Sequence, residues 1–193
     1  MATTPRYFFG ALPGLYESER WLTRLAAAGV ASKLGRRMFA MENWHQTLSG
    51  RHFDADEATI AGLLEAGSRI TAHAVTLRFN RVIWTQGEPE RRNHCTLFTH
   101  GRPVEFDALL SAVQVALKDV GLDDSEGHRP HITLSYDAGE LHPTVQLIPI
   151  EWTIDEILLL KGHGSPYRYD VIGRWPLLPP ASPQHQNDLF ALG

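Results

Sequence analysis

The sequence predicts an α+β protein made of two similar lobes. Strands alternate with helices in the first half of the chain, and the same order of elements returns in the second half. The length of 193 residues fits one domain or two small, tightly fused lobes. Hydrophobic residues form 43% of the chain and charged residues 21%, as in folded globular proteins. The chain can therefore bury a core without disulfides or metal, and wholesale disorder or a coiled coil is excluded.

The first half of the chain holds the elements of one lobe. Pro13 suits the first turn of a helix, whose apolar residues recur at helical spacing until Gly29 stops it. A second helix starts at Asp54, a capping residue with Glu57 three positions later, and runs to about Arg69. In order, we predict a strand over 6–12, the helix between 13 and 29, short strands over 36–41 and 44–49, the helix over 54–69, and a long strand or hairpin over 71–84.

The loop over 86–93 is the best candidate for a lobe boundary, because it combines Gly, Pro and charged residues between two apolar patterns. We assign residues 1–85 to the first lobe and residues 86–175 to the second, with strands free to cross between them. Residues 176–193 form a proline-rich tail that we expect to be extended or disordered. The second lobe is predicted to contain strands over 94–99 and 131–136, a helix over 105–119, and a final strand pair near 152–162 and 168–175.

Charge and cysteine content narrow the class of protein. The chain has 18 Lys and Arg against 22 Asp and Glu, and the net charge of −4 argues against non-specific coating of long duplex nucleic acid. The single cysteine, Cys95, cannot form an intrachain disulfide. The apolar run from Tyr7 to Leu12 is too short for a signal peptide, and no run approaches the roughly 20 residues of a membrane span. We expect a cytoplasmic monomer that does not associate with membranes.

Two pentapeptides carry the strongest functional signal. The segments 45–49 (HQTLS) and 131–135 (HITLS) share the pattern H-x-T-L-S, and their histidines lie 86 residues apart, close to half the chain. An isolated histidine would more often be a core residue held by hydrogen bonds, and threonine is common in strands for its β-propensity alone. The duplication of the whole pattern favours a functional interpretation instead.

Strand geometry indicates how these segments would present their side chains. Residues i and i+2 of a strand share a face. His45 would therefore point the same way as Thr47, and His131 the same way as Thr133. The residues on the opposite face would point into the lobe; they are Leu48, Ile132 and Leu134. Each lobe thus offers one imidazole and one hydroxyl.

The paired motifs resemble those of the 2H phosphoesterase superfamily, and within it the bacterial RNA 2',3'-cyclic phosphodiesterases, the LigT-like proteins also called 2'-5' RNA ligases. The resemblance covers most of residues 6–175. It includes Asn43-Trp44 before the first motif, Arg129-Pro130 before the second, and the opening RYFFGALP. It implies two pseudo-symmetric lobes, each an antiparallel sheet with helices on its outer face, around a central groove that one motif from each lobe faces.

The same resemblance implies an activity and roles for the motif residues. The substrates would be RNA 3' ends or nucleotides bearing a 2',3'-cyclic phosphate, hydrolysed to 2'-phosphomonoesters, with reversible 2'-5' ligation as a further activity. His45 would be the proton donor to the 3' oxygen and His131 the proton acceptor from water. Thr47 and Thr133 would bind the phosphate. The sequence alone does not order the acid and the base.

Elementary chemistry suits two histidines for this reaction. In-line hydrolysis of a cyclic phosphodiester needs a base to activate water and an acid to protonate the departing oxygen on the opposite side. Histidine has a reference pKa near 6.5, so both its protonation states are accessible near neutral pH. Threonine hydroxyls can donate hydrogen bonds to phosphate oxygens.

Two positions depart from the family pattern. The bacterial enzymes often have an arginine two residues after the second T-L, where this chain has Tyr136, which can hydrogen-bond a phosphate but cannot neutralise it. Gln46 places a polar group where the family usually has an apolar one. Four arginines are candidates for the missing charge and the sequence does not choose among them: Arg51, Arg78, Arg129 and Arg168.

We expect neither metal nor cofactor. The remaining histidines form no H-E-x-x-H pattern and no Cys/His cluster at the spacing of metal ligands. Aromatic residues in the predicted strands are core by default, although one of them could stack on a base, as in single-stranded RNA readers. The aromatic candidates are Phe8, Phe9, Trp44, Phe98 and Trp152.

Three functional hypotheses follow from the sequence. The leading one is the metal-independent 2',3'-cyclic phosphodiesterase. A related 2H enzyme acting on a small cyclic phosphate, such as ADP-ribose 1'',2''-cyclic phosphate, is the alternative within enzymes. A weakly catalytic module that binds RNA ends is the alternative from another class. The two intact motifs favour catalysis, and the absence of a basic run favours a small or single-ended ligand.

Overall fold

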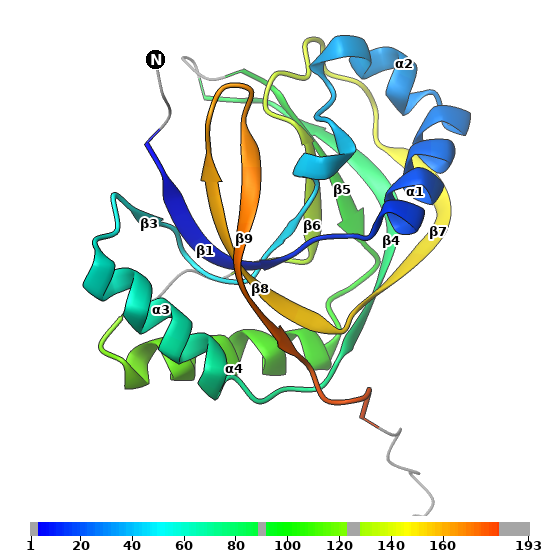
Figure 1. Cartoon of the computed structure of the whole chain (residues 1–193). Helices are drawn as coiled ribbons and strands as arrows, with labels where there is room; N and C mark the ends of the chain where they lie inside the picture. Colours follow the sequence, from blue (N-terminus) through cyan, green and yellow to red (C-terminus); the bar gives the residue numbers. More distant parts are fainter. Residues whose placement is uncertain (1–3, 89–91, 123–127, 182–193) are drawn as a thin grey trace, which may run out of the picture.

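The computed structural model describes residues 4–88, 92–122 and 128–181. Within these residues, nine strands and four α-helices form two antiparallel sheets with helices packed around them (Figure 1). The strands are β1 (Arg6–Ala11), β2 (Gln46–Thr47), β3 (His52–Phe53), β4 (Val75–Thr85), β5 (His94–Thr99), β6 (His131–Ser135), β7 (Val145–Ile154), β8 (Glu156–His163) and β9 (Arg168–Pro176). The helices are α1 (Leu15–Ala27), α2 (Val30–Leu34), α3 (Glu57–Arg69) and α4 (Val104–Asp119). The predicted α+β class with two antiparallel sheets is confirmed.

Each sheet carries one of the two motifs on an edge strand. The first sheet has the order β2-β1-β8-β9, with β3 also paired to β1, and the second has the order β6-β5-β4-β7. The first motif begins just before β2, where Gln46 pairs with Ala11 and Thr47 with Gly10. The second motif is β6 itself, which pairs only with β5 within the described chain. Both histidines therefore stand at sheet edges, where a strand has room for a ligand on its free side.

The two sheets exchange strands between the halves of the sequence. β4 lies within residues 1–85 but pairs with β5 and β7 in the second sheet, and β8 and β9 lie within residues 86–175 but join β1 in the first sheet. The sheets therefore do not follow the division at the 86–93 loop. Strand crossing of this kind binds the two sheets into one body.

The chain passes from the second sheet to the first at Asp155. β7 ends at Ile154 and pairs with β4, and β8 begins at Glu156 and pairs with β1. The prediction of one strand over 152–162 is wrong, because two strands in different sheets meet there. Neither Gly nor Pro marks this point, and apolar residues continue on both sides of it, so the local sequence resembles an uninterrupted strand.

The segment before β2 differs from the two predicted short strands. Residues 35–37 and 41–43 form 3₁₀ turns, and only Gln46 and Thr47 pair as a strand. Between the turns, the Phe39 N–H donates to the Leu134 carbonyl of β6 at 2.8 Å. A tertiary hydrogen bond to the second sheet thus takes the place of the predicted local strand.

The N-cap of helix α3 lies two residues later than predicted. Its N-cap is Asp56, whose carboxylate accepts from the Thr59 N–H at 2.8 Å. Asp54 instead has a positive φ of 49° in the turn that leads into the helix. Both aspartates satisfy the capping rule, and the turn geometry selects the second.

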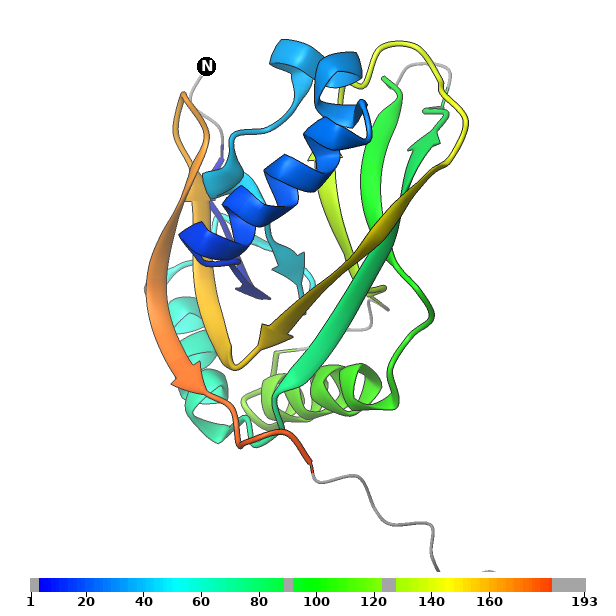
Figure 2. The same ribbon diagram turned by 90° about the vertical axis from the view of Figure 1, so that its right-hand side faces the viewer.

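The helices cover the two sheets on different sides. α1 packs on β7, α3 packs on β8 and β9, and α4 packs against α3 and β4. Figure 2 shows α3 beside the strands of the first sheet and α4 across the end of the second. None of the helices in the described part of the chain is both long and apolar enough to cross a membrane.

An aromatic cluster in the core anchors the segment of the first motif. Trp21 of α1 is fully buried and stacks on Trp44 with ring centroids 6.2 Å apart. Trp21 also contacts the rings of Phe79 and Trp152, each at 5.4 Å, on the second sheet. Because Trp44 directly precedes His45, burial of this indole fixes the backbone that carries the first imidazole.

The start of the tail is held against the lead-in to β4. The Leu178 N–H donates to the Ala72 carbonyl at 2.9 Å, and the Leu178 carbonyl accepts from the Ala74 N–H at 2.8 Å. His73 and Leu178 thereby form a parallel bridge. The end of the predicted tail, residues 182–193, lies outside the described residues.

The docking of α3 on the first sheet depends on a glycine, which has no side chain, at the point of contact. The indole of Trp175 on β9 lies directly over Gly67, at a position where a Cβ on Gly67 would overlap the ring. Gly67 is buried, whereas Gly62, one and a half turns earlier in α3, has ordinary space toward Leu122. The close approach of helix and sheet therefore needs glycine at position 67.

We predict that Gly67→Ala lowers the free energy of unfolding by about 1–3 kcal/mol, because the steric overlap with Trp175 outweighs the helix propensity of alanine. Gly62→Ala is the matched control and should change stability by at most about 1 kcal/mol, in the stabilising direction. Urea unfolding of both variants measures the difference. Equal stabilisation by both substitutions would show that the contact with Trp175 is not tight.

Candidate active site

The two motif histidines are held in the same way. The Nδ1 of His45 lies 2.9 Å from the Asn43 carbonyl, and the Nδ1 of His131 lies 2.7 Å from the Arg129 carbonyl. Each partner is the carbonyl two residues earlier. Since a carbonyl only accepts, each Nδ1 carries the hydrogen and each Nε2 is left for a ligand. The repeated sequence pattern therefore produces a repeated imidazole orientation.

The apolar residues of the motifs lie where strand alternation places them. Leu48, Ile132 and Leu134 are buried in the core, as predicted. Thr47 is buried, and Thr133 is partly exposed opposite Thr96 of β5. The serines that end the motifs have structural roles: Ser49 accepts from the Phe9 N–H at 2.8 Å, and Ser135 accepts from the Asp137 N–H at 3.0 Å.

Gln46 connects the two motifs directly. Its side chain is fully buried, and its Oε1 accepts from the His131 N–H at 2.8 Å. Its Nε2 donates to the Arg129 carbonyl at 3.2 Å and to the Thr47 carbonyl at 2.8 Å. The Arg129 carbonyl therefore receives both Gln46 Nε2 and His131 Nδ1. The polar residue that departs from the family pattern is a bridge between the two sheets.

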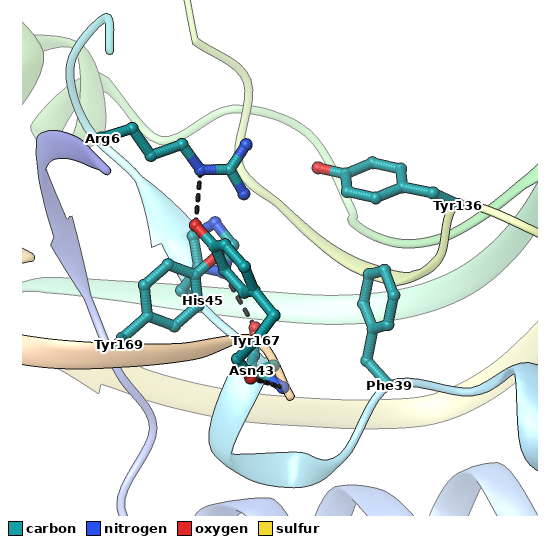
Figure 3. A pocket seen from close by; sticks show the side chains of 7 residues that line it. All are labelled: Arg6, Phe39, Asn43, His45, Tyr136, Tyr167 and Tyr169. Carbon is teal, nitrogen blue, oxygen red and sulfur yellow. Dashed lines mark hydrogen bonds between the residues drawn. The ribbon is translucent and has the colours of Figure 1, made fainter. Parts of the chain in front are cut away.

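A pocket of about 300 Å³ opens beside His45 (Figure 3). Its wall on the first sheet carries Arg6 and the two tyrosines of the β8–β9 hairpin, and its opposite wall carries Phe39 and Tyr136, which follows β6. The pocket thus lies where the two sheets meet. The residues that line it are Arg6, Phe39, Asn43, His45, Tyr136, Tyr167 and Tyr169.

The first-sheet wall is a connected set of polar contacts. The Arg6 Nε donates to the Tyr167 hydroxyl at 2.6 Å, and the Asn43 amide donates to the Tyr167 carbonyl at 3.2 Å. The Tyr169 ring meets the His45 ring edge-on at 4.8 Å. Burial raises the pKa of Tyr169 well above its usual range, so its hydroxyl stays protonated and can donate. Asn43 therefore holds both the hairpin and the first imidazole.

Both histidines have lowered pKa values. Burial lowers the pKa of His45 to about 4, and the positive charges of Arg51 and Arg6 add to the effect. Burial and Arg51 also lower the pKa of His131. Both imidazoles are consequently neutral at pH 7 in the free protein, with bare Nε2 atoms that can accept a proton.

The four arginines that are candidates for the missing positive charge differ in their surroundings. Arg51 acts electrostatically on both histidines, and it has no carboxylate partner among the described residues. Arg78 lies 4.0 Å from Glu151, and Arg168 lies 3.5 Å from Asp170. Arg129 contributes its carbonyl to His131. Arg51 is the candidate best placed to serve both motifs.

Sequence reasoning missed several pocket residues. Arg6 was not among the candidate arginines, although it shares a strand face with Phe8, whose ring lies 5.4 Å from that of His45. Tyr167 and Tyr169 belong to the β8–β9 hairpin, and Tyr169 lies on the same face of the sheet, with its ring 5.7 Å from that of Phe8. Only the pairing of β1 with β8 and of β8 with β9 brings these residues to the first motif.

The sequence matches no family model and no curated protein. Solved structures match the fold over most of the chain. A crystal structure of a phosphoesterase is 22% identical, with a TM-score of 0.68, and the match covers 91% of this chain and 99% of that one. Escherichia coli LigT in its apo form is 24% identical, with a TM-score of 0.67 and the same coverage. A protein of Thermus thermophilus is 16% identical, with a TM-score of 0.67, covering 89% of this chain and 97% of that one. The chain therefore has the two-lobed fold of LigT that the motifs predicted.

We predict that Gln46→Leu lowers the free energy of unfolding by about 1–3 kcal/mol, because it leaves the His131 N–H without its buried acceptor. Gln114→Leu, at a partly exposed position of α4, is the matched control and should stay within about 0.5 kcal/mol of the wild type. Denaturant unfolding with an unchanged m-value measures both. A Gln46→Leu variant as stable as the wild type would show that the bridge contributes nothing.

Proposed function

We propose that this protein hydrolyses 2',3'-cyclic phosphates at the ends of RNA or nucleotides, without a metal ion. The observation that carries the proposal is the matched pair of histidines, one from each sheet, with each Nδ1 bonded to a carbonyl and each Nε2 free. Two imidazoles that face one phosphate from opposite sides can supply the base and the acid that in-line displacement needs. The fold shared with a phosphoesterase and with LigT supports this reaction class.

His131 acts as the base and His45 as the acid. The bare Nε2 of His131 takes a proton from water, the hydroxide attacks phosphorus, and the bond from phosphorus to the 3' oxygen breaks. The Nε2–H of protonated His45 gives its proton to that oxygen, which leaves a 2'-phosphate. His45 must therefore gain its proton as the substrate binds, and the negative charge of the cyclic phosphate favours this by raising the pKa of His45.

Hydroxyl and guanidinium groups would hold the phosphate. Thr47 and Thr133 each stand two residues after a histidine on its strand face, so their hydroxyls can donate to the non-bridging oxygens. Arg51 places a positive charge near both histidines. Tyr136, at the pocket wall, adds a hydroxyl donor in place of the arginine of the family pattern.

The aromatic pocket beside His45 suits the terminal nucleoside. Phe39, Tyr136, Tyr167 and Tyr169 offer ring surfaces for a base, and Arg6 offers donors to a ribose or phosphate oxygen. Structures of E. coli LigT in complex with 3'-AMP and with phosphate support a nucleotide ligand for this fold. No three His, Cys, Asp or Glu side chains among the described residues are grouped to hold a metal ion.

The test is turnover of a cyclic mononucleotide in excess EDTA, with phosphorus NMR of the product. The wild type should give mainly 2'-phosphate. His45→Ala and His131→Ala should each lower kcat/KM by about 10² or more, because each removes a proton-transfer partner, while Thr47→Ala and Thr133→Ala should cost less.

Ser111→Ala, on the exposed side of α4, is the control and should be neutral. Near-wild-type rates in either histidine variant would refute the two-histidine mechanism. A predominant 3'-phosphate would show that the acid and base are exchanged.

We predict an acid-shifted, bell-shaped dependence of kcat/KM on pH. One histidine must be protonated and the other neutral, so the optimum lies between their two lowered pKa values, below pH 6.5, and activity falls above it as the acid loses its proton. Arg51→Gln removes a positive charge that disfavours both imidazolium ions, so both pKa values rise and the optimum moves to higher pH. Arg36→Gln, at an exposed position outside the pocket, should leave the profile in place. An optimum above pH 7 in the wild type would contradict the burial of His45.

A further inference from the structure

A row of side chains leads across the second sheet away from His131. His131 pairs with Phe98 on β5, and Phe98 pairs with Arg81 on β4. Residues directly opposite on neighbouring strands share a face, so the imidazole, the phenyl ring and the guanidinium group stand on one side of the sheet. The rings of His131 and Phe98 are 5.9 Å apart. Two strand spacings carry the row about 10 Å from His131.

The row borders a hollow of about 460 Å³ next to the second motif, which we call the Arg81 hollow. Its charged lining residues are three arginines, and none of the described residues that line it is acidic. They are Arg81, Ile83, Phe98, Thr99, Gly101, Arg102, Arg129 and Pro130. These arginines are scattered in sequence and form no basic run, so the cluster exists only in the folded protein.

Two of the three guanidinium groups have no carboxylate partner among the described residues and can meet a ligand. Arg102 is already paired with Asp107. Arg81 and Arg129 have no carboxylate partner in the described part of the chain, and the buried Nε of Arg81 has no hydrogen-bond partner there. A buried guanidinium N–H without a hydrogen-bond partner costs free energy, and an anion bound in the hollow would supply the missing acceptor.

We propose that the Arg81 hollow binds the nucleotide that precedes the terminal one, so that the preferred substrate is an RNA end and not a free nucleotide. The inference rests on the proposed function, which places the terminal phosphate between the two histidines. The preceding base would stack on Phe98, and Arg81 and Arg129 would hold the phosphate that joins the two nucleotides.

Each of the two hollows adjoins one of the two motif histidines. The aromatic pocket adjoins His45, and the Arg81 hollow adjoins His131 through Phe98 and Pro130. A cyclic mononucleotide fills the first and the phosphate site but leaves the second empty. A chain of two nucleotides occupies both, and its one internal phosphate meets the arginines that the fold has gathered.

Two probes with the same terminal nucleotide test the inference: a mononucleotide 2',3'-cyclic phosphate and a dinucleotide ending in that group. The wild type should show a kcat/KM about tenfold higher for the dinucleotide, from one stacked base and one charge-assisted contact. Arg81→Gln should abolish most of this preference and leave the mononucleotide rate unchanged, and Phe98→Leu should weaken the preference in the same way.

Arg78→Gln is the matched control, since Arg78 stands on the same strand but is exposed beside Glu151 and should keep the preference intact. Equal rates for the two probes, or a preference that survives Arg81→Gln, would overturn the inference while leaving cyclic phosphate hydrolysis in place.

Measurements of binding affinity test this inference independently of the proposed function. Calorimetry with a dinucleotide and a mononucleotide, each ending in a 2'-phosphate, should give a Kd about tenfold lower for the dinucleotide in the wild type but not in Arg81→Gln. That result without turnover of either cyclic probe would refute the proposed hydrolysis and uphold the Arg81 hollow. Equal Kd values in the wild type would refute the hollow alone.

Discussion

The hydrogen bonds of the buried Gln46 side chain join the edge strands of two sheets that share no backbone pairing. Gln46 sits inside the first motif and receives the backbone N–H of the histidine that opens the second. Its amide also reaches the Arg129 carbonyl, the group that orients the His131 ring. Together with the bond from Phe39 to Leu134, this bridge sets how far apart the two imidazoles lie. A change in its length would move one histidine relative to the other, and the proposed proton transfer at both sides of one phosphate requires that distance to be fixed.

Enclosure of the histidines has an electrostatic consequence. The same burial that fixes each ring disfavours its charged form, and Arg51 lowers both pKa values further. The free site is therefore poised as two bases with a cation beside them, which is a site that favours an anion. Under the proposed function, binding of a phosphodiester reverses the balance for one ring, because its negative charge raises the pKa of His45. In that mechanism the substrate itself creates the acid.

The sequence predicted the parts of the fold that depend on local pattern. Strand alternation placed Leu48, Ile132 and Leu134 in the core, and the duplicated motif singled out two histidines that the structure holds in the same way. It could not show that β7 and β8 part at Asp155, because no turn residue marks a crossing between sheets. Nor could it assign Arg6, Tyr167 or Arg81 to a ligand site, because strand pairings distant in sequence bring them there. The sequence showed that Gln46 departs from the family's usual apolar residue, but only its hydrogen-bond partners in the fold explain why a polar residue stands there.

In the proposed mechanism both imidazoles keep a hydrogen on Nδ1 and offer Nε2 to a single phosphate. Nitrogen-15 NMR of histidine side chains, with His45 and His131 assigned by substitution, distinguishes the tautomers. At about pH 8, where both rings are neutral, we expect the Nδ1–H tautomer for both, with inorganic phosphate shifting both Nε2 resonances. An Nε2–H tautomer at either histidine, or a phosphate response confined to one of them, would contradict it.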